Sequence, residues 1–311
     1  MWWQKAVVGG ALLLSVGAAA ERTSRQRDRA LPERGRLIDA GGYQVRIYEA
    51  GESGPSVALV AGAGHCAASW VPVADNIATS ARVTSYDRAG MGGSANGPPP
   101  TLDRYLAELS SVIPRARGDR PFILAGHSLG GLIVRIYAQQ HPADVARLVL
   151  VDATPEAVPG DPAVKTGSLA SAAMASVFRL LAPFGFVRFL LAIGKMPLYP
   201  EQDLLPSAVS AEGYRRWTAA ACRDFAGAAG PELRSVLPTA AESQRRRAGT
   251  TAPPFGDLPL GVLTSHAWGA KWIEMHRELP TRSRSSFHQV TGKRSHNVHI
   301  RHPCLAADAH P

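Results

Sequence analysis

One serine lies in a setting that could turn its hydroxyl into a nucleophile. The stretch Pro121–Tyr137 reads PFILAGHSLGGLIVRIY, in which three glycines surround Ser128. The apolar run Phe122–Ala125 predicts a buried strand, and Leu129–Gln140 has the spacing of a helix. A Gly-x-Ser-x-Gly sequence between a strand and a helix permits a tight turn that lifts the serine above the sheet. The sequence therefore predicts that Ser128 is a nucleophile.

A serine hydroxyl is a weak nucleophile, so other groups must activate it. It needs a base to take its proton, an acid to orient the base, and N–H donors for the developing oxyanion. Gly62-Ala63-Gly64 follows the apolar run Ser56–Val60, where a second oxyanion donor is expected. We predict that the N–H groups of Ala63 and Leu129 form the oxyanion hole.

Five stretches of the chain resemble the α/β-hydrolase fold family, and they come in the order of that family. The chain is similar to its lidded serine hydrolases, which implies an α/β fold with a mostly parallel sheet, helices on both faces and an inserted helical lid. It also implies an enzyme that uses no metal and no organic cofactor. The stretches are AGAGHCAASW at 61–70, YDRAGMGGS at 86–94, PFILAGHSLGG at 121–131, LVLVDATPE at 148–156 and SHNVHIRHP at 295–303.

The same resemblance implies a base and an acid. His296 matches the base, in the loop after the last strand, and His299 is the nearest alternative. Many relatives carry the acid just after the seventh strand, where this chain has no carboxylate. Some take it from the end of the sixth strand, and Asp152 matches that place. We expect Asp152 to be the acid, with Glu274 as the alternative, because either location can reach the same histidine.

The order of predicted elements supports this fold. Strand-like and helical runs alternate up to about Pro155 and resume at Leu260–Thr264, a rhythm typical of a parallel sheet covered by helices. The segment between them is apolar and helical, without a predicted strand. We predict one core in two parts, 36–155 and 257–311, with a helical lid at 156–256. The apolar residues of the lid could form an acyl-binding pocket, pack on the core, or contact a bilayer.

The N-terminus has the composition of a targeting or anchoring segment. Ala6–Ala20 is apolar and uncharged and ends in three alanines, as in a signal peptide. Trp2–Ala20 is also nearly long enough to span a bilayer. The sequence predicts a signal peptide or membrane anchor at 1–20 and a basic linker at 21–35. It favours an anchored or exported protein over a cytoplasmic one.

Charge and cysteine content exclude several other classes. The net charge is +9, but the arginines are spread along the chain and no nucleic-acid-binding motif accompanies them. The three cysteines are too scattered for a disulfide framework or a zinc site. The sequence predicts no nucleic-acid partner and a small-molecule ester as substrate.

These observations predict a serine hydrolase that cleaves a carboxylic ester, small or lipophilic, through an acyl-enzyme on Ser128. Two alternatives stay open. The same fold could support an acyltransferase or a cofactor-free perhydrolase, because the motifs are shared. The chain could also be a non-catalytic, membrane-tethered binding protein.

Overall fold

An eight-stranded sheet organises the protein, whose computed structural model describes residues 2–31, 34–116, 118–198, 210–247 and 255–307. The strand order is β1-β2-β4-β3-β5-β6-β7-β8. β2 pairs antiparallel with β1 and β4, and all other neighbours are parallel. The strands are β1 (Arg36–Asp39), β2 (Gln44–Ala50), β3 (Ser56–Val60), β4 (Arg82–Asp87), β5 (Phe122–His127), β6 (Val145–Val151), β7 (Leu260–Thr264) and β8 (Ser286–Val290).

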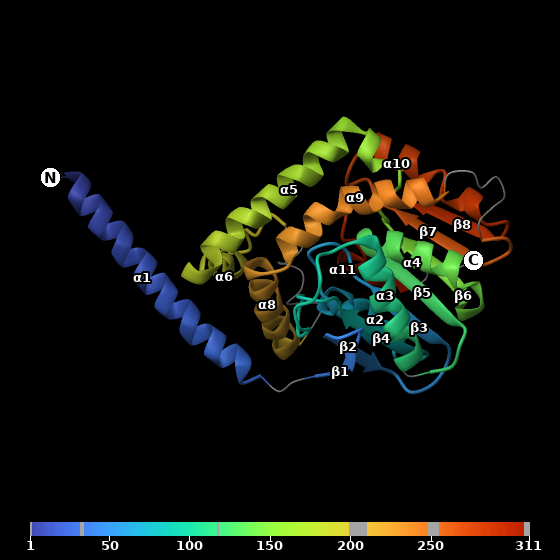
Figure 1. Cartoon of the computed structure of the whole chain (residues 1–311), viewed down its shortest axis with the longest axis horizontal. Helices are drawn as coiled ribbons and strands as arrows, with labels where there is room; N and C mark the ends of the chain where they lie inside the picture. Colours follow the sequence, from blue (N-terminus) through green and yellow to red (C-terminus); the bar gives the residue numbers. More distant parts are fainter. Residues whose placement is uncertain (1, 32–33, 117, 199–209, 248–254, 308–311) are drawn as a thin grey trace.

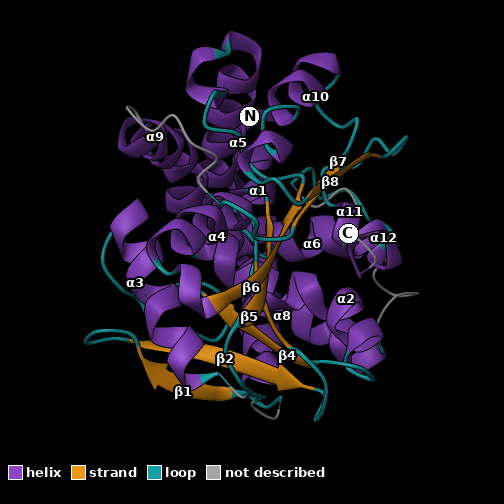
Figure 2. Ribbon diagram, turned by 90° about the vertical axis from the view of Figure 1, so that its right-hand side faces the viewer, coloured by secondary structure: helices purple, strands orange, loops and turns teal. Residues whose placement is uncertain are grey.

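Helices cover both faces of this sheet (Figure 2). Val60 and its neighbours Ala58 and Leu124 pack with α3 and α4 in one apolar core. Val57 and Leu59 point the other way and pack with α2, α11 and α12. A strand buried on both faces must be apolar throughout, which is why β3 reads SVALV. These helices are α2 (Val71–Ile77), α3 (Leu102–Val112), α4 (Leu129–Gln140), α11 (Val298–Arg301) and α12 (Pro303–Ala307).

A group of helices, called the lid here, lies between β6 and β7 in the chain and beside the sheet in space (Figure 1). Its helices pack on one another through an aromatic centre made of Phe178, Trp217 and Phe225. The predicted parallel sheet with helices on both faces and an inserted helical region is thus confirmed. The lid consists of α5 (Pro162–Leu181), η5 (Ala182–Phe184), α6 (Phe186–Ala192), α8 (Ala211–Ala226) and α9 (Ala229–Arg247), and α10 (Ala270–His276) follows β7.

The N-terminal helix α1 (Trp2–Arg29) extends away from the body, and its second half contacts the lid (Figure 1). The segment 21–35, which we expected to be a linker, is therefore helical as far as Arg29. Buried Glu21 explains the difference, because it pairs with Arg25 at 2.9 Å and with Arg188 of α6 at 2.8 Å.

One helical stretch in the described part of the chain, Pro162–Phe184, is long and apolar enough to cross a membrane. Only 22 % of its most apolar part is buried inside the protein. Core helices of soluble proteins reach the same length and composition.

Short connecting helices complete the fold. The short helix η1 (Ala67–Trp70) leads directly into α2. The last strand, β8, ends at Val290. The short helices α11 and α12 follow it in the chain and pack against α2. The other short helices are η2 (Ile113–Arg115), η3 (Pro142–Asp144), η4 (Val158–Gly160) and η6 (Pro280–Arg282).

Candidate active site

Ser128 lies on a strained turn between β5 and α4. Its φ of 52° and ψ of −119° are costly for a residue with a side chain. A Cβ on Gly126 would come within 2.5 Å of the Gly130 carbonyl, and a Cβ on Gly130 within 2.2 Å of the Val60 oxygen. The glycines are needed because the helix packs directly on the strands, and this turn exposes the hydroxyl of Ser128.

Three residues from distant parts of the chain meet at this turn. The Nε2 atom of His296 lies 2.9 Å from the hydroxyl oxygen of Ser128, and its Nδ1 atom lies 2.6 Å from Oδ2 of Asp152. Glu274, the alternative acid, is exposed and pairs with Lys271 on the surface. The structure thus brings Ser128, His296 and Asp152 together and leaves Glu274 outside.

Asp152 is fully buried and held by residues that the sequence analysis did not identify. Ser265 donates to it from both its backbone N–H and its hydroxyl, each at 2.8 Å, and the Nε1–H of Trp272 donates at 2.9 Å. Burial alone would raise the pKa of Asp152, but the hydrogen bond and charge of His296 hold that pKa below its usual value. Asp152 is therefore ionised and oriented toward His296.

Ser265 stands just after β7, the place where many relatives of the chain carry their acid. A serine there donates to a carboxylate that arrives from β6 instead. The missing carboxylate after the seventh strand was the one sequence signal that could have pointed to this contact.

A second histidine contacts the backbone of the loop that carries His296. The Nε2 atom of His127 lies 2.9 Å from the carbonyl oxygen of His296. His299, the alternative base, is buried and stacks between His127 and Trp70 at ring distances of 4.2 and 4.5 Å. Burial lowers the pKa of both His127 and His299 well below the usual value, so both are neutral.

The loop after β3 carries the predicted oxyanion residue Ala63, and a buried ion pair holds this loop. Arg88 donates to the carbonyls of Ala61 at 2.6 Å and Gly62 at 2.7 Å. The same guanidinium binds Glu232 of the lid helix α9, with a closest distance of 2.6 Å. Burial alone would lower the pKa of Arg88, but the charge of Glu232 keeps that pKa above its usual value.

The placement of the two predicted oxyanion residues is compatible with their role, which remains a prediction. Ala63 lines the same cavity as Ser128. Leu129 is the first residue of α4, where backbone N–H groups of a helix have no partner within the helix.

A cavity of about 340 Å³ opens beside Ser128, between the core and the lid. Aromatic and aliphatic side chains from α5, α8, α9 and α10 form part of its wall, and Ser168 and Ser171 add hydroxyls. Such a mixture suits an apolar ligand that is oriented by a few polar groups. The large aliphatic and aromatic lining residues are Val158, Val164, Leu198, Phe225, Leu233, Val236, Trp268 and Trp272.

Other reactive groups in the described part of the chain do not compete with this site. No cluster of three or more His, Cys, Asp or Glu side chains among the described residues could hold a metal ion. Burial raises the pKa of the Cys66 thiol well above its usual value, so that thiol stays protonated and is a poor nucleophile.

Comparison with known proteins gives partial sequence matches. The model of the α/β-hydrolase fold family matches residues 55–183. The chain is 29 % identical over 116 residues to the protein YqjL of Bacillus subtilis, covering 37 % of this chain and 46 % of YqjL. It is 31 % identical over 126 residues to a 2-hydroxy-6-oxo-2,4-heptadienoate hydrolase of Pseudomonas putida, covering 39 % of this chain and 45 % of that protein. The matched region thus spans less than half of these curated relatives.

Solved structures match over most of the chain. The enol-lactonase of Burkholderia xenovorans LB400 is 17 % identical with a TM-score of 0.59, covering 87 % of this chain and 96 % of the other. A thermophilic esterase of Thermogutta terrifontis is 15 % identical with a TM-score of 0.60, covering 89 % and 96 %. At this identity the likeness concerns the fold. With the sheet topology and the turn at Ser128, these matches show that the chain has the α/β-hydrolase fold.

Proposed function

We propose that the protein is a serine hydrolase that cleaves a carboxylic ester through an acyl-enzyme on Ser128. The observation that carries this proposal is the continuous hydrogen-bonded path from Ser128 through His296 to Asp152. His296 faces the nucleophile with one ring nitrogen and an ionised carboxylate with the other. This arrangement fits a base that must take a proton from a hydroxyl and carry a positive charge afterwards.

In the first half of the reaction, the hydroxyl oxygen of Ser128 attacks the ester carbonyl while its proton moves to Nε2 of His296. Asp152 stabilises the resulting imidazolium. The N–H groups of Ala63 and Leu129 donate to the oxyanion of the tetrahedral intermediate. When that intermediate collapses, the proton on His296 passes to the departing alkoxide, and an acyl group remains on Ser128.

In the second half, His296 removes a proton from a water molecule that attacks the acyl-enzyme. The tetrahedral intermediate collapses again, the proton returns to Ser128, and the carboxylic acid leaves. The apolar wall of the cavity supports a lipophilic acyl or alcohol group as the rest of the substrate. Ser128 and His296 therefore make every bond change and proton transfer assigned to the protein, and the reaction consumes one ester and one water molecule.

Hydrolysis of p-nitrophenyl esters of increasing acyl length tests this proposal on the full chain in detergent. We expect turnover in the parent, and a fall in kcat of about 10⁴-fold or more in Ser128→Ala and Asp152→Asn. Asp257→Asn is the matched control, because Asp257 is exposed and pairs with Arg284 on the surface. It should keep the parental rate.

Other outcomes distinguish the alternatives. Turnover that survives Asp152→Asn would remove that residue from the acid role. Ester products formed with added alcohol, or peracid formed with hydrogen peroxide, would favour acyl transfer or perhydrolysis. A folded parent that neither turns over esters nor reacts with a fluorophosphonate at Ser128 would contradict catalysis and leave the binding-protein alternative.

A further inference from the structure

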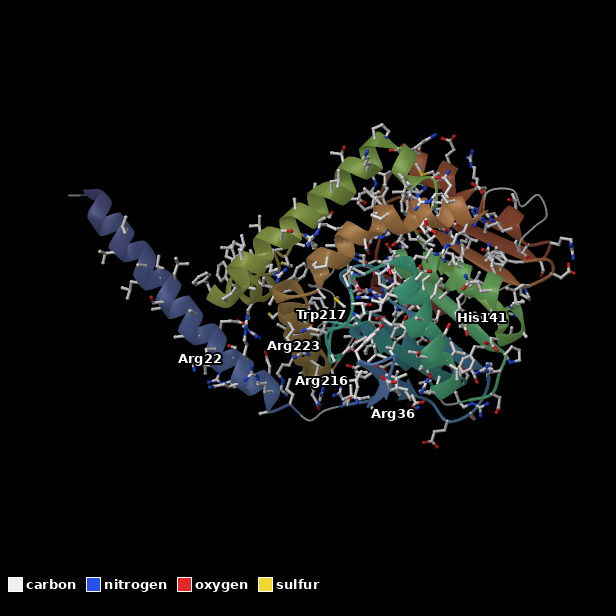
Figure 3. All side chains as sticks on the ribbon, viewed as in Figure 1. Arg22, Arg36, His141, Arg216, Trp217 and Arg223 are labelled. Atoms are coloured by element: carbon white, nitrogen blue, oxygen red, sulfur yellow. The ribbon has the colours of Figure 1, made fainter. Side chains whose placement is uncertain are left out.

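The first half of α1 presents large apolar side chains to its surroundings. Leu13 is 75 % exposed, and Val8, Leu12 and Val16 are also exposed. Arg22, Arg25, Arg27 and Arg29 lie in the polar half of α1, which begins at Glu21, and Arg22 projects from the point where this half begins (Figure 3). An exposed apolar helix followed by arginines is typical of a segment that inserts into a bilayer and keeps its charges among the lipid headgroups.

This helix crosses the lid at a close contact. A Cβ on Gly17 would lie 2.4 Å from the carbonyl oxygen of Phe184, and a Cβ on Gly185 would lie 3.2 Å from the carbonyl oxygen of Gly17. The polar half is fixed as well, since Arg188 of α6 pairs with Glu21 at 2.8 Å and with Asp28 at 2.7 Å. Wherever α1 binds, the α5–α6 end of the lid lies next to it.

That end of the lid is itself apolar on the outside. Leu180 is 73 % exposed and Phe189 is 56 % exposed, with Phe184, Phe186 and Ile193 also exposed. Monomeric soluble proteins rarely expose so many large apolar side chains near one another without a binding partner. Together with Val8, Leu12, Leu13 and Val16 of α1, these five residues are called the docking face.

The charges around the docking face indicate the partner. No aspartate or glutamate occurs between Asp161 and Glu201. Arg179 and Lys195 are exposed within this segment, beside Leu180 and Ile193 respectively. Apart from Glu21 and Asp28, which pair with Arg188, the charges named here at the edges of the docking face are positive. Such a surface fits a bilayer containing anionic lipids, where basic residues contribute attraction to the headgroups.

We propose that α1 and the lid together form a membrane-binding surface that docks on an anionic lipid bilayer. One consequence of this proposal rests on the proposed hydrolase function. It is that the substrate is a lipid-soluble ester taken from the bilayer. Pro197 and Leu198, which line the cavity beside Ser128, follow Ile193 of the docking face by only a few residues. The lid therefore connects the membrane surface with the active site.

Vesicle flotation of the full chain tests the docking independently of catalysis. One set of vesicles contains phosphatidylcholine alone, and the other contains phosphatidylcholine with about 30 % of the anionic lipid phosphatidylglycerol. We expect the parent to float with the anionic vesicles. The double variant Phe186→Ser/Phe189→Ser should bind them at least about tenfold more weakly, because the two aromatic side chains supply much of the buried apolar area. The matched control is Leu37→Ser/Phe287→Ser, which changes two exposed apolar side chains elsewhere and should bind like the parent.

A second measurement links the docking to the substrate. Hydrolysis of a medium-chain ester dissolved in the anionic vesicles should fall in the lid variant in proportion to binding, while hydrolysis of water-soluble p-nitrophenyl acetate stays at the parental rate. Equal vesicle binding of parent and lid variant would overturn the proposal, as would a parent that does not float. Vesicle binding without hydrolysis of either ester would overturn the hydrolase function and leave the docking surface standing.

Discussion

The carboxylate of Glu232, on the lid helix α9, accepts a hydrogen bond from the backbone N–H of Gly64 in the loop after β3, with 3.0 Å between the two atoms. The same carboxylate binds the guanidinium of Arg88, whose remaining donors hold carbonyl groups of that loop. The lid thus fixes the loop directly beside Ala63, whose N–H we assign to the oxyanion hole.

Glu232→Gln should impair catalysis more than substrate binding. The amide keeps the shape of the side chain but leaves the charge of buried Arg88 without its partner, which costs about 3–5 kcal/mol in comparable buried pairs. We expect kcat to fall about tenfold to a hundredfold with a smaller change in KM, since the oxyanion donor acts in the transition state. Steady-state kinetics with a p-nitrophenyl ester and the midpoint of urea unfolding measure the two effects.

The matched control for this change is Glu242→Gln, on the same helix. Glu242 pairs with Arg245 and Arg246 at the surface, so its substitution should alter neither kcat nor the unfolding midpoint. A Glu232→Gln protein with parental kcat would show that the loop keeps its geometry without the lid.

Ser265→Ala should weaken the orientation of the base. The substitution removes one hydrogen bond to the Asp152 carboxylate and leaves the backbone N–H contact in place. A hydrogen bond to a charged group contributes about 1.5–3 kcal/mol, so we expect kcat/KM to fall about tenfold.

Ser243→Ala separates this effect from a general loss of stability. Ser243 is also buried and donates to a buried carboxylate, that of Glu156, at 3.0 Å. The two variants should lose similar amounts of unfolding free energy, but only Ser265→Ala should lose activity. Equal loss of activity in both would contradict an orienting role for Ser265.

His276 should make the protein less stable in mild acid. This buried side chain bonds the carbonyl oxygen of Ala153, and burial lowers its pKa to about 4. The unfolded chain has a histidine pKa near 6.5, so the unfolded state binds the proton first. The stabilising contribution is complete above about pH 6.5 and is lost as the pH falls toward 4. From pH 8 to pH 5 it amounts to about 2 kcal/mol.

Urea unfolding at pH 8 and pH 5 measures this contribution as a difference between variants. His276→Gln, whose amide can still donate to Ala153, should lose about 2 kcal/mol less than the parent over this range. His141→Gln is the control, because His141 is exposed at the end of α4 (Figure 3), and its pH dependence should match the parent. Identical pH dependence in His276→Gln would mean that other buried groups cause the acid sensitivity.

The close crossing of α1 and the lid predicts a contrast between two glycines of the same helix. Gly17→Leu should separate α1 from the lid, because its Cβ would overlap the Phe184 carbonyl, whereas the position of Gly10 is open. We expect trypsin to cleave the arginines between 22 and 29 at least about tenfold faster in Gly17→Leu. Gly10→Leu should be cleaved at the parental rate. Equal cleavage of the two variants would show that α1 is not held by this contact.

The sheet and the turn at Ser128 could be predicted because their signals are local. Apolar runs of five to seven residues specify strands such as β3 and β7 directly. Gly126 is needed for a close contact with Gly130, only four residues later in the chain. The resemblance to a family then selected His296 and Asp152, which the structure brings within hydrogen-bond distance of each other.

Contacts between distant segments could not be predicted in the same way. Ser265, Trp272 and Glu232 have ordinary residue types, and only the folded chain places them against Asp152 or the oxyanion loop. The helical continuation of α1 was missed for a related reason. Its arginine-rich composition is typical of a linker, but the pairing of Glu21 with Arg188 of the lid stabilises the helix.

The location of the acid has a consequence for how this protein could change its specificity. Asp152 directly follows β6, so the loop after β7 does not have to supply the carboxylate that contacts His296. That loop contributes Ala267 and Trp268 to the cavity wall. Only Ser265 in that loop contacts the acid. We expect replacement of Ala267 to reshape the substrate pocket while Ser265 and Trp272 keep Asp152 in place.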